Sequence, residues 1–316
     1  MNTSTAMIAM GGNSISPKDG TGKIEEQFER TRQAINGIFH FVERGYNLCI
    51  NHGNGPQVGN EILRMELTQN TIPSLPLGVC VASTQGSIGY MIQQCLQNKL
   101  REMKIDREVV TLVSQVIVNK NDNFFAEPTK FVGKRYTKIE ATQMTSQYGW
   151  HFKEQEEGQY RRVVPSPMPK YIMHGKSIKA LVDRATIVIA SGGGGIPVFN
   201  NSFGKLEGLD AVIDKDYSAA KMGRIIRAQE LWIITDVDAV YENFGSSNQK
   251  RISSMTKKEA EKFHDAGLFQ KGSIAPKVTA AIHFLKHHGD KVIITSIPRI
   301  KDALNGSAGT EIRNEA

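Results

Sequence analysis

Long apolar runs and paired cysteines are both missing from this chain of 316 residues. No stretch approaches the roughly 18 consecutive apolar residues that a membrane-spanning helix needs, and no basic segment precedes an apolar one near the N-terminus, as in a secretory signal. The three cysteines, Cys49, Cys80 and Cys95, lie in apolar surroundings without C-x-x-C spacing. We therefore expect a cytoplasmic protein without a membrane partner, in which these cysteines are buried, reduced thiols.

Patterns for metal and nucleic-acid binding are scarce as well. The eight histidines show no zinc-ligand spacing. The excess of 39 Lys and Arg over 32 Asp and Glu gives a net charge of +7, which suits either small anionic substrates or nucleic acid. Basic residues cluster only in pairs, such as Lys134–Arg135, and no basic stripe alternates with aromatic residues. We expect no nucleic-acid partner and no metal held by protein side chains.

The chain does contain one pattern three times: an apolar run typical of a buried strand, followed by a glycine-rich loop. The runs cover residues 5–10, 47–52 and 185–190, and they lead into Gly11–Gly12–Asn13, Gly53–Asn54–Gly55 and Gly192–Gly193–Gly194–Gly195. Glycine lets the backbone approach a ligand closely and direct N–H groups at it. Because the carboxyl ends of parallel strands share one edge of a sheet, we predict a polyanion site built from backbone amides there.

The rest of the chain alternates between helical and strand patterns, which indicates a parallel sheet covered by helices. Expected helices cover residues 24–42, 58–67, 84–103, 177–184, 219–228, 256–267 and 276–289; further strands cover 109–118, 211–213, 231–234 and 292–294. Between about residues 119 and 170 the pattern becomes polar and ends in Pro165–Ser166–Pro167–Met168–Pro169. A loop of ~50 residues is improbable in a compact domain, so we predict a small inserted subdomain, which could serve as a lid.

Named nucleotide-binding motifs fail when tested. Gly175–Lys176–Ser177 has the end of a Walker A motif, but Lys170 stands where its first glycine belongs. The loop from Gly53 to Gly59 approaches G-x-G-x-x-G, but its last glycine comes one residue late. The three glycine loops together still favour anion binding.

Three lysines strengthen this prediction. Lys215 lies between two aspartates directly after the expected strand 211–213, Lys277 lies near a helix start just past Gly272–Ser273, and Lys130 lies in the inserted segment. A lysine alone is usually a solvated surface residue. Phosphoryl transfer, however, mainly requires positioning and cationic stabilisation, which lysines held by an aspartate can supply. Asp236 and Asp238 could cap a turn or lie beside a nucleotide, and both interpretations stay open.

Six motifs resemble, in order along nearly the whole chain, those of the carbamate kinases. They are Gly11–Gly12–Asn13, His52–Gly53–Asn54–Gly55–Pro56–Gln57–Val58–Gly59, Pro128–Thr129–Lys130, Ser191–Gly192–Gly193–Gly194–Gly195–Ile196–Pro197, Ala211–Val212–Ile213–Asp214–Lys215–Asp216 and Thr235–Asp236–Val237–Asp238. The second and fifth, with Pro128–Thr129–Lys130, separate this family from other amino-acid kinases.

The resemblance implies an α/β fold: a single three-layer αβα sandwich over residues 1–316 with an open, mainly parallel central sheet, from which about residues 119–170 protrude as a lid. It also implies a homodimer that interconverts ATP plus carbamate with ADP plus carbamoyl phosphate, using Mg²⁺ held mainly by the nucleotide phosphates. In similar enzymes the favoured direction makes ATP at the end of arginine breakdown by the deiminase route.

The resemblance also assigns roles to matching residues. Lys130 would contact the carbamoyl group, Lys215 would stabilise the transferring phosphoryl group, Asp216 would hold the lysines in place, and Lys277 would bind nucleotide phosphates. The residues around the phosphoryl group and carbamate would be Gly11, Gly12, Asn13, Gly53, Asn54, Gly55, Gly193 and Gly194. Asp236 and Tyr241 would lie near the nucleoside.

One departure and three alternatives stand beside this interpretation. The family more often has Gly-Pro-Phe-Tyr where this chain has Gly133–Lys134–Arg135–Tyr136, so we expect the loss of the proline to loosen the lid and add charge there. The alternatives are a family relative acting on N-acetylglutamate or UMP, a nucleotide sensor without catalysis, and a nicotinamide oxidoreductase. The failed G-x-G-x-x-G pattern disfavours the last of these.

Overall fold

The computed structural model describes residues 3–16, 20–269, 274–287 and 289–315, and an eight-stranded sheet forms its centre. In spatial order its strands are β15 (Ser254–Thr256), β17 (Thr310–Arg313), β16 (Lys291–Thr295), β12 (Glu230–Ile234), β1 (Thr5–Met10), β2 (Asn47–His52), β9 (Ile187–Ala190) and β3 (Val109–Leu112). The strands from β16 to β3 run parallel, whereas β17 and β15 run the opposite way. The mainly parallel sheet is confirmed.

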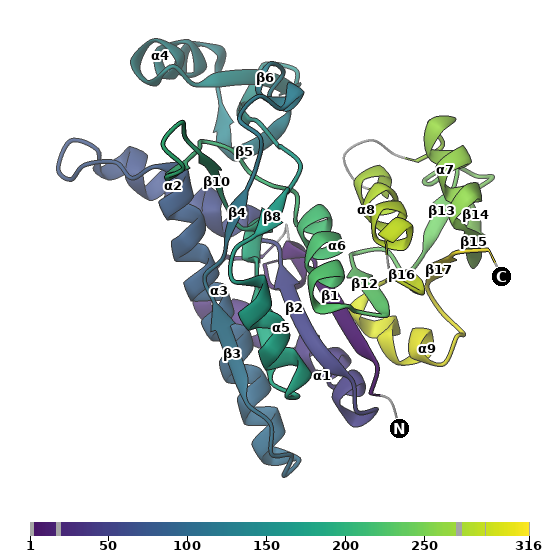
Figure 1. Ribbon diagram of the computed structural model, residues 1–316. Coiled ribbons are helices and arrows are strands. Elements are labelled where there is room, and N and C mark those ends of the chain that lie inside the picture. The colour runs from purple at the N-terminus through teal and green to yellow at the C-terminus, as the bar shows by residue number, and fades with distance from the viewer. Residues whose placement is uncertain (1–2, 17–19, 270–273, 288, 316) are drawn as a thin grey trace.

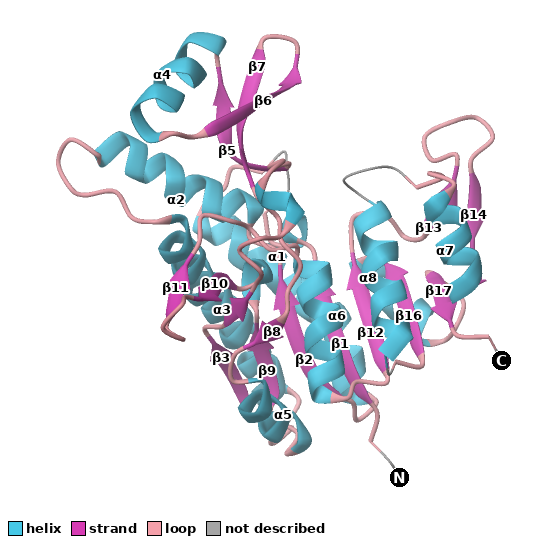
Figure 2. Ribbon diagram, turned by 45° about the horizontal axis from the view of Figure 1, so that its top comes forward, coloured by secondary structure: helices cyan, strands magenta, loops and turns pink. Residues whose placement is uncertain are grey.

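Helices cover both faces of this sheet, because its central strands are apolar on both sides. Along β1, Met7 and Ala9 join one buried cluster, whereas Ala6, Ile8 and Met10 join the other. The first cluster lies under α5 (Gly175–Asp183), α6 (Lys215–Ile226), α7 (Lys257–Asp265) and α8 (Ile274–His287); the second lies under α1 (Ile24–Glu43), α3 (Leu77–Glu102) and α9 (Ile300–Leu304). Figure 2 shows α5, α6 and α8 in front of the strands. The three-layer αβα arrangement is therefore confirmed.

Two smaller sheets extend from the carboxyl edge of the main sheet. One contains β11 (Leu206–Gly208), β10 (Ile196–Asn200), β4 (Gln115–Ile117) and β8 (Tyr171–Ile172). The other orders β5 (Lys130–Tyr136), β7 (Gln159–Val164) and β6 (His151–Glu156), and α4 (Lys138–Tyr148) packs against it. This second sheet and α4 stand out at the top of the molecule, beside α2 (Gly55–Thr68) (Figure 1). A hairpin of β13 (Val240–Glu242) and β14 (Lys250–Ile252) lies near the C-terminal strands.

The structure corrects three of the predicted elements and adds others. The expected strand 109–118 is divided between β3 and β4, since Ser114 leaves the main sheet and bonds its backbone N–H and C=O to the Gln85 side chain. Residues 211–213 are buried but form no strand; the Val212 amide donates to Pro165 instead. Helix α3 begins at Leu77, before the expected residue 84; Gly78, Val79 and Val81, which have low helix propensity, mask its first turns in the sequence. Strand β17 was not predicted.

The other expected helices are present, with ends that differ from the predicted ones by up to four residues, and the expectation about the cysteines agrees with the structure. Thr256 and Glu259 form the predicted capping box of α7, and Pro276 lies in the first turn of α8. Cys49, Cys80 and Cys95 are all buried and unpaired. Within the described residues, no helix combines the length and apolar character needed to cross a membrane.

Candidate active site

The loops after β1 and β2 touch at the carboxyl edge of the sheet. The Gly11 amide donates to the Ile234 carbonyl (3.0 Å), and the Gly53 amide donates to the Met10 carbonyl (2.9 Å). A Cβ atom on Gly53 would lie 2.7 Å from the backbone nitrogen of Gly12. Only glycine fits at this crossing, so the two loops form one continuous backbone surface.

The third glycine loop closes over the second. It forms the short helix η3 (Gly192–Gly194), in which Gly193 and Gly194 have φ values of +63° and +91°. Side chains rarely adopt these angles, and Cβ atoms there would overlap the Asn54 side chain and the Ile213 carbonyl respectively. The predicted convergence of three strand-end loops is therefore what the structure shows.

Helix α6 begins beside these loops, and its first residues carry the predicted charges. Asp214 is its N-cap and accepts a hydrogen bond from the Asp216 amide (2.9 Å). Lys215 is the first helical residue, and its carbonyl accepts a bond from the Asn51 side chain on β2 (2.8 Å). The cap and this bond fix the direction in which Lys215 and Asp216 leave the helix.

Asp216 links two lysines from different helices. One of its carboxylate oxygens lies 2.5 Å from Lys215 Nζ, the other 3.0 Å from Lys277 Nζ in the first turn of α8, and Asp216 is only 2% exposed. Burial acts to raise the pKa of Asp216, but the two lysines outweigh it and hold that pKa well below its usual range. Burial lowers the pKa of Lys215, whereas for Lys277 Asp216 outweighs burial and raises the pKa.

Lys130 reaches the same place from the protruding sheet. It begins β5, and its Nζ lies 2.8 Å from a carboxylate oxygen of Asp214. A cavity of about 250 Å³ lies between these groups, and the predicted site residues that line it are Gly53, Asn54, Gly55, Lys130, Gly193, Lys215, Asp216 and Lys277. Three ammonium groups and the backbone of two glycine loops thus surround a space suited to a small, highly charged anion.

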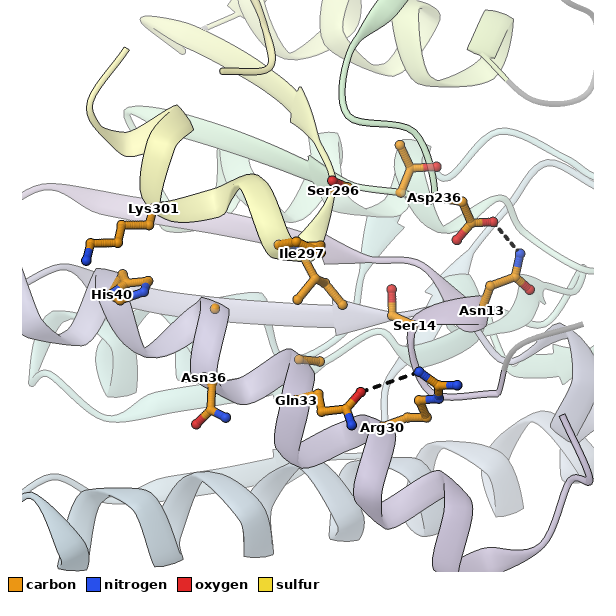
Figure 3. Close-up of a pocket in the computed structure, with 14 residues that line it drawn as sticks. Asn13, Ser14, Arg30, Gln33, Asn36, His40, Asp236, Ser296, Ile297 and Lys301 are labelled. Carbon is orange, nitrogen blue, oxygen red and sulfur yellow. Dashed lines mark hydrogen bonds between the residues drawn. The ribbon is translucent and has the colours of Figure 1, made fainter. Parts of the chain in front are cut away.

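Six predicted site residues do not line this cavity: Gly11, Gly12 and Gly194 belong to the glycine loops beside it, and Asn13, Asp236 and Tyr241 lie elsewhere. The Asn13 side chain donates to the Asp236 carboxylate (2.6 Å), and both residues line a separate cavity of about 500 Å³ between α1 and η4 (Ile297–Arg299). Figure 3 shows this pair at one end of that cavity, with His40 and Lys301 at the other. Tyr241 is on β13, where its hydroxyl donates to Asp238 (2.8 Å), so Asp238 holds a tyrosine in place. Gly272 and Ser273, expected before Lys277, lie outside the described residues.

Sequence reasoning missed two groups of the cavity. In the sequence, Asp214 stands out only as a neighbour of Lys215. In the structure it both caps α6 and pairs with Lys130. Arg161 on β7 also lines the cavity, with its guanidinium over the Phe131 ring (5.7 Å). The capping preference of aspartate could have indicated Asp214. Arg161 gave no usable signal, because its position depends on how the protruding sheet pairs.

Glu66 on α2 connects the protruding sheet to the main body. Its carboxylate accepts a hydrogen bond from the Tyr136 hydroxyl and lies 3.5 Å from Lys134 Nζ. Both partners are on β5, the strand that Lys130 begins. Glu66 thus forms an ion pair with Lys134, the residue that adds charge here. This contact opposes the expected loosening of the lid.

We predict that Glu66→Ala frees this sheet while the main sheet stays intact. The buried Tyr136 hydroxyl would lose its acceptor, which costs about 1–3 kcal/mol. Amide hydrogen exchange in β5 and β7 should rise about tenfold, because each 1.4 kcal/mol corresponds to a factor of about ten. Glu61→Ala is the matched control: Glu61 is on the same helix and pairs with Arg64 of that helix rather than with the protruding sheet. Equal exchange in the two variants would contradict the prediction.

Comparison with known proteins agrees with this geometry. The sequence profile of the amino acid kinase family matches residues 4–296. The carbamate kinase of Pyrococcus horikoshii is 41% identical over 308 residues, covering 97% of this chain and 98% of that protein. Carbamate kinase 2 of Staphylococcus epidermidis is 42% identical over 316 residues, covering 98% and 100%.

Solved structures give the same result. Carbamate kinase from Giardia lamblia bound to AMP-PNP superposes with a TM-score of 0.93 at 35% identity, covering 99% of each chain. UMP kinase from Bacillus anthracis, at 13% identity and a TM-score of 0.53, shares the fold alone. The chain belongs to the amino acid kinase family and, within it, to the carbamate kinases.

Proposed function

We propose that this kinase transfers a phosphoryl group reversibly between ATP plus carbamate and ADP plus carbamoyl phosphate. The observation that carries the proposal is the buried carboxylate of Asp216 between Lys215 and Lys277, facing Lys130 across a cavity with glycine-loop walls. In the forward direction a carbamate oxygen forms a bond to the γ-phosphorus, the bond from that phosphorus to the β-γ bridging oxygen breaks, and ADP leaves. Negative charge on the equatorial oxygens then meets cations already in position.

The proposed roles follow the sequence motifs. Lys215 stabilises the transferring phosphoryl group, Lys277 binds nucleotide phosphates, Lys130 contacts the carbamoyl group, and Asp216 positions the first two. The remaining phosphoryl- and carbamate-binding groups are Gly11, Gly12, Asn13, Gly53, Asn54, Gly55, Gly193 and Gly194. Asp236 and Tyr241 lie near the nucleoside in this proposal, with residues 119–170 acting as the lid of a single domain.

The reaction needs no general base, which suits the groups present. Carbamate already carries a negative charge on its attacking oxygen, unlike a hydroxyl acceptor. Burial lowers the pKa of His52, in the second glycine motif, to about 4, and its Nδ1 lies 3.0 Å from the Gly53 carbonyl. A neutral, buried imidazole supports the glycine loop rather than accepting a proton from a substrate.

Mg²⁺ is proposed to enter with the nucleotide. The cavity carboxylates of Asp214 and Asp216 already accept bonds from lysines, and the described residues hold no group of three or more His, Cys, Asp or Glu side chains arranged for a metal. Nucleotide phosphate oxygens, which Mg²⁺ favours, are therefore its natural ligands here. When bound, the ion would neutralise phosphate charge.

The physiological setting is also a proposal. The family resemblance favours ATP formation in the cytoplasm, as the last step of arginine breakdown by the deiminase route, by a homodimer. On α3, Val79 and Tyr90 are exposed on one face with the open surface of Gly86 between them, which supports a dimer contact through this helix. Sedimentation equilibrium that gave the monomer mass of 35.0 kDa at micromolar concentration would contradict the homodimer.

A coupled assay of ATP formed from ADP and carbamoyl phosphate tests the activity directly. We expect turnover with this pair and none above background when ATP is offered with N-acetylglutamate or UMP. Testing the three substrates separately is necessary, because kinases for carbamate, N-acetylglutamate and UMP all consume ATP. Only the substrate that supports turnover distinguishes them. Turnover of UMP or N-acetylglutamate, but not of carbamoyl phosphate, would overturn the proposal.

A further inference from the structure

A second, smaller cavity lies between α6 and α8, away from the proposed phosphoryl-transfer site. Its volume is about 200 Å³, and it shares no lining residue with the cavity around Lys215. Lys221 and Arg224 on α6 and His283 and His287 on α8 line it, and none of the described residues that line it is acidic. We call these four residues the α6–α8 basic cluster.

The positive charge of this cluster has no counterion in the part of the chain that the structure describes. Among the described residues, no carboxylate comes within 4.0 Å of any of the four side chains. The pKa values of His283 and His287 are lowered first by burial and then by neighbouring cations, which include Lys221 and Lys286. Cations held together without an anion repel one another, so the arrangement costs free energy until an anion enters.

Helix dipoles account for only part of the cluster. Arg224 and His287 lie in the last turns of α6 and α8, where cations are favoured. Lys221 lies in the middle of α6 and His283 more than one turn before the end of α8, where the dipole effect has faded. The C-terminal ends of the two helices contribute roughly half a negative charge each. This does not neutralise the two permanent positive charges of Lys221 and Arg224.

The walls of the cavity shape it for a small ligand. The linker residues Met168 and Pro169, which lead back from the protruding sheet, close one side, and Tyr217 closes another. The Tyr217 ring packs edge-on against His283 (ring centroids 6.4 Å apart), which helps to orient that imidazole. The volume is below the roughly 300–1,000 Å³ of pockets for drug-sized ligands, so the cavity suits a small ion rather than a whole nucleotide.

We propose that the α6–α8 basic cluster binds a small phosphate-class anion, inorganic phosphate or pyrophosphate, as a site separate from the phosphoryl-transfer cavity. The proposal rests on the charge and shape of this cavity and holds whatever substrate the kinase uses. Helix α6 begins with Lys215 of the proposed active site and carries Lys221 of the cluster six residues later. Helix α8 carries Lys277 in its first turn and His283 six residues later. Six helical residues span roughly 9 Å along the axis. A bound anion would therefore tie together the two helices that position Lys215 and Lys277.

Isothermal titration with pyrophosphate, and separately with phosphate, tests the proposal on the full chain. We expect one binding event that Lys215→Ala retains and that Lys221→Gln combined with Arg224→Gln weakens at least tenfold. The matched control is Lys205→Gln with Arg184→Gln, which removes the same charge from exposed positions and should leave this event unchanged within twofold. Thermal unfolding should show the same pattern, because an anion that binds only the folded state raises the melting temperature.

Two results would overturn the proposal. One is binding that disappears in Lys215→Ala but persists in the Lys221/Arg224 double variant, which would place the anion in the phosphoryl-transfer cavity alone. The other is the absence of binding to the wild-type chain. If the double variant does not fold, as circular dichroism would show, His283→Asn with His287→Asn alters two exposed residues of the cluster and must weaken the same event.

Discussion

We expect Lys215→Ala to lower kcat by about 10²-fold or more while the fold survives. Lys215 lines the cavity with glycine-loop walls, and in the proposed mechanism its ammonium group meets the charge that develops on the transferring phosphoryl group. Removal of one such preorganised group costs on the order of 10²–10³ in kcat in other enzymes. The methylene chain of Lys215 lies beside Gly53, so the substitution opens space without creating a clash.

The measurement is steady-state formation of ATP, with circular dichroism to check the fold. Lys205→Ala is the matched control, because it removes the same group from an exposed position that does not line the cavity. We expect its kcat to equal that of the wild type within twofold. A Lys215→Ala enzyme with undiminished kcat would remove Lys215 from the active site.

Asp216→Asn should reduce both stability and turnover, since this one buried carboxylate pairs with two largely buried lysines. Removing one partner of a buried ion pair costs about 3 kcal/mol or more, because the remaining charges are left without compensation. In the folded wild type the pKa of Asp216 is depressed. Its contribution to stability is therefore fully present above the unfolded pKa of about 4 and is lost only as the pH falls through the lower, folded value.

Denaturant unfolding at pH 7 and a pH profile of kcat test this second expectation. Asp183→Asn, which breaks an exposed pair with Lys179, is the control and should change the free energy of unfolding by about 1 kcal/mol at most. Without Asp216, burial lowers the pKa of Lys215 further, so the residual kcat of Asp216→Asn should rise as the pH falls. A profile parallel to that of the wild type would leave Asp216 with a structural role only.

Periodicity and turn chemistry predict most of the parallel core. The apolar runs of β1, β2 and β9 indicate strands buried on both faces. Of the glycines that follow them, Gly53 is required by a close backbone contact, and Gly193, Gly194 and Gly195 by positive φ. The capping box of α7 and the proline of α8 are equally local signals. These signals depend on a few adjacent residues, which is why they can be read without the fold.

Elements whose identity depends on distant partners were missed. Strand β17 has only four residues and gains its partners from β16 and β15, and residues 211–213 have the apolar character of a strand but bond to Pro165 instead. The division of 109–118 depends on Gln85, 29 residues away. Local composition does not encode such pairings.

For the active site, the sequence by itself determined the chemical groups: three glycine loops at strand ends, three lysines and an aspartate beside one of them. Only the tertiary structure decided which groups meet, because side-chain contacts depend on how the helices and sheets pack. It pairs Lys277 with Asp216, 61 residues away in the sequence, and Lys130 with Asp214, 84 residues away. It also places Asn13 and Asp236 in a separate cavity. Geometry between distant segments follows from packing, which short motifs do not specify.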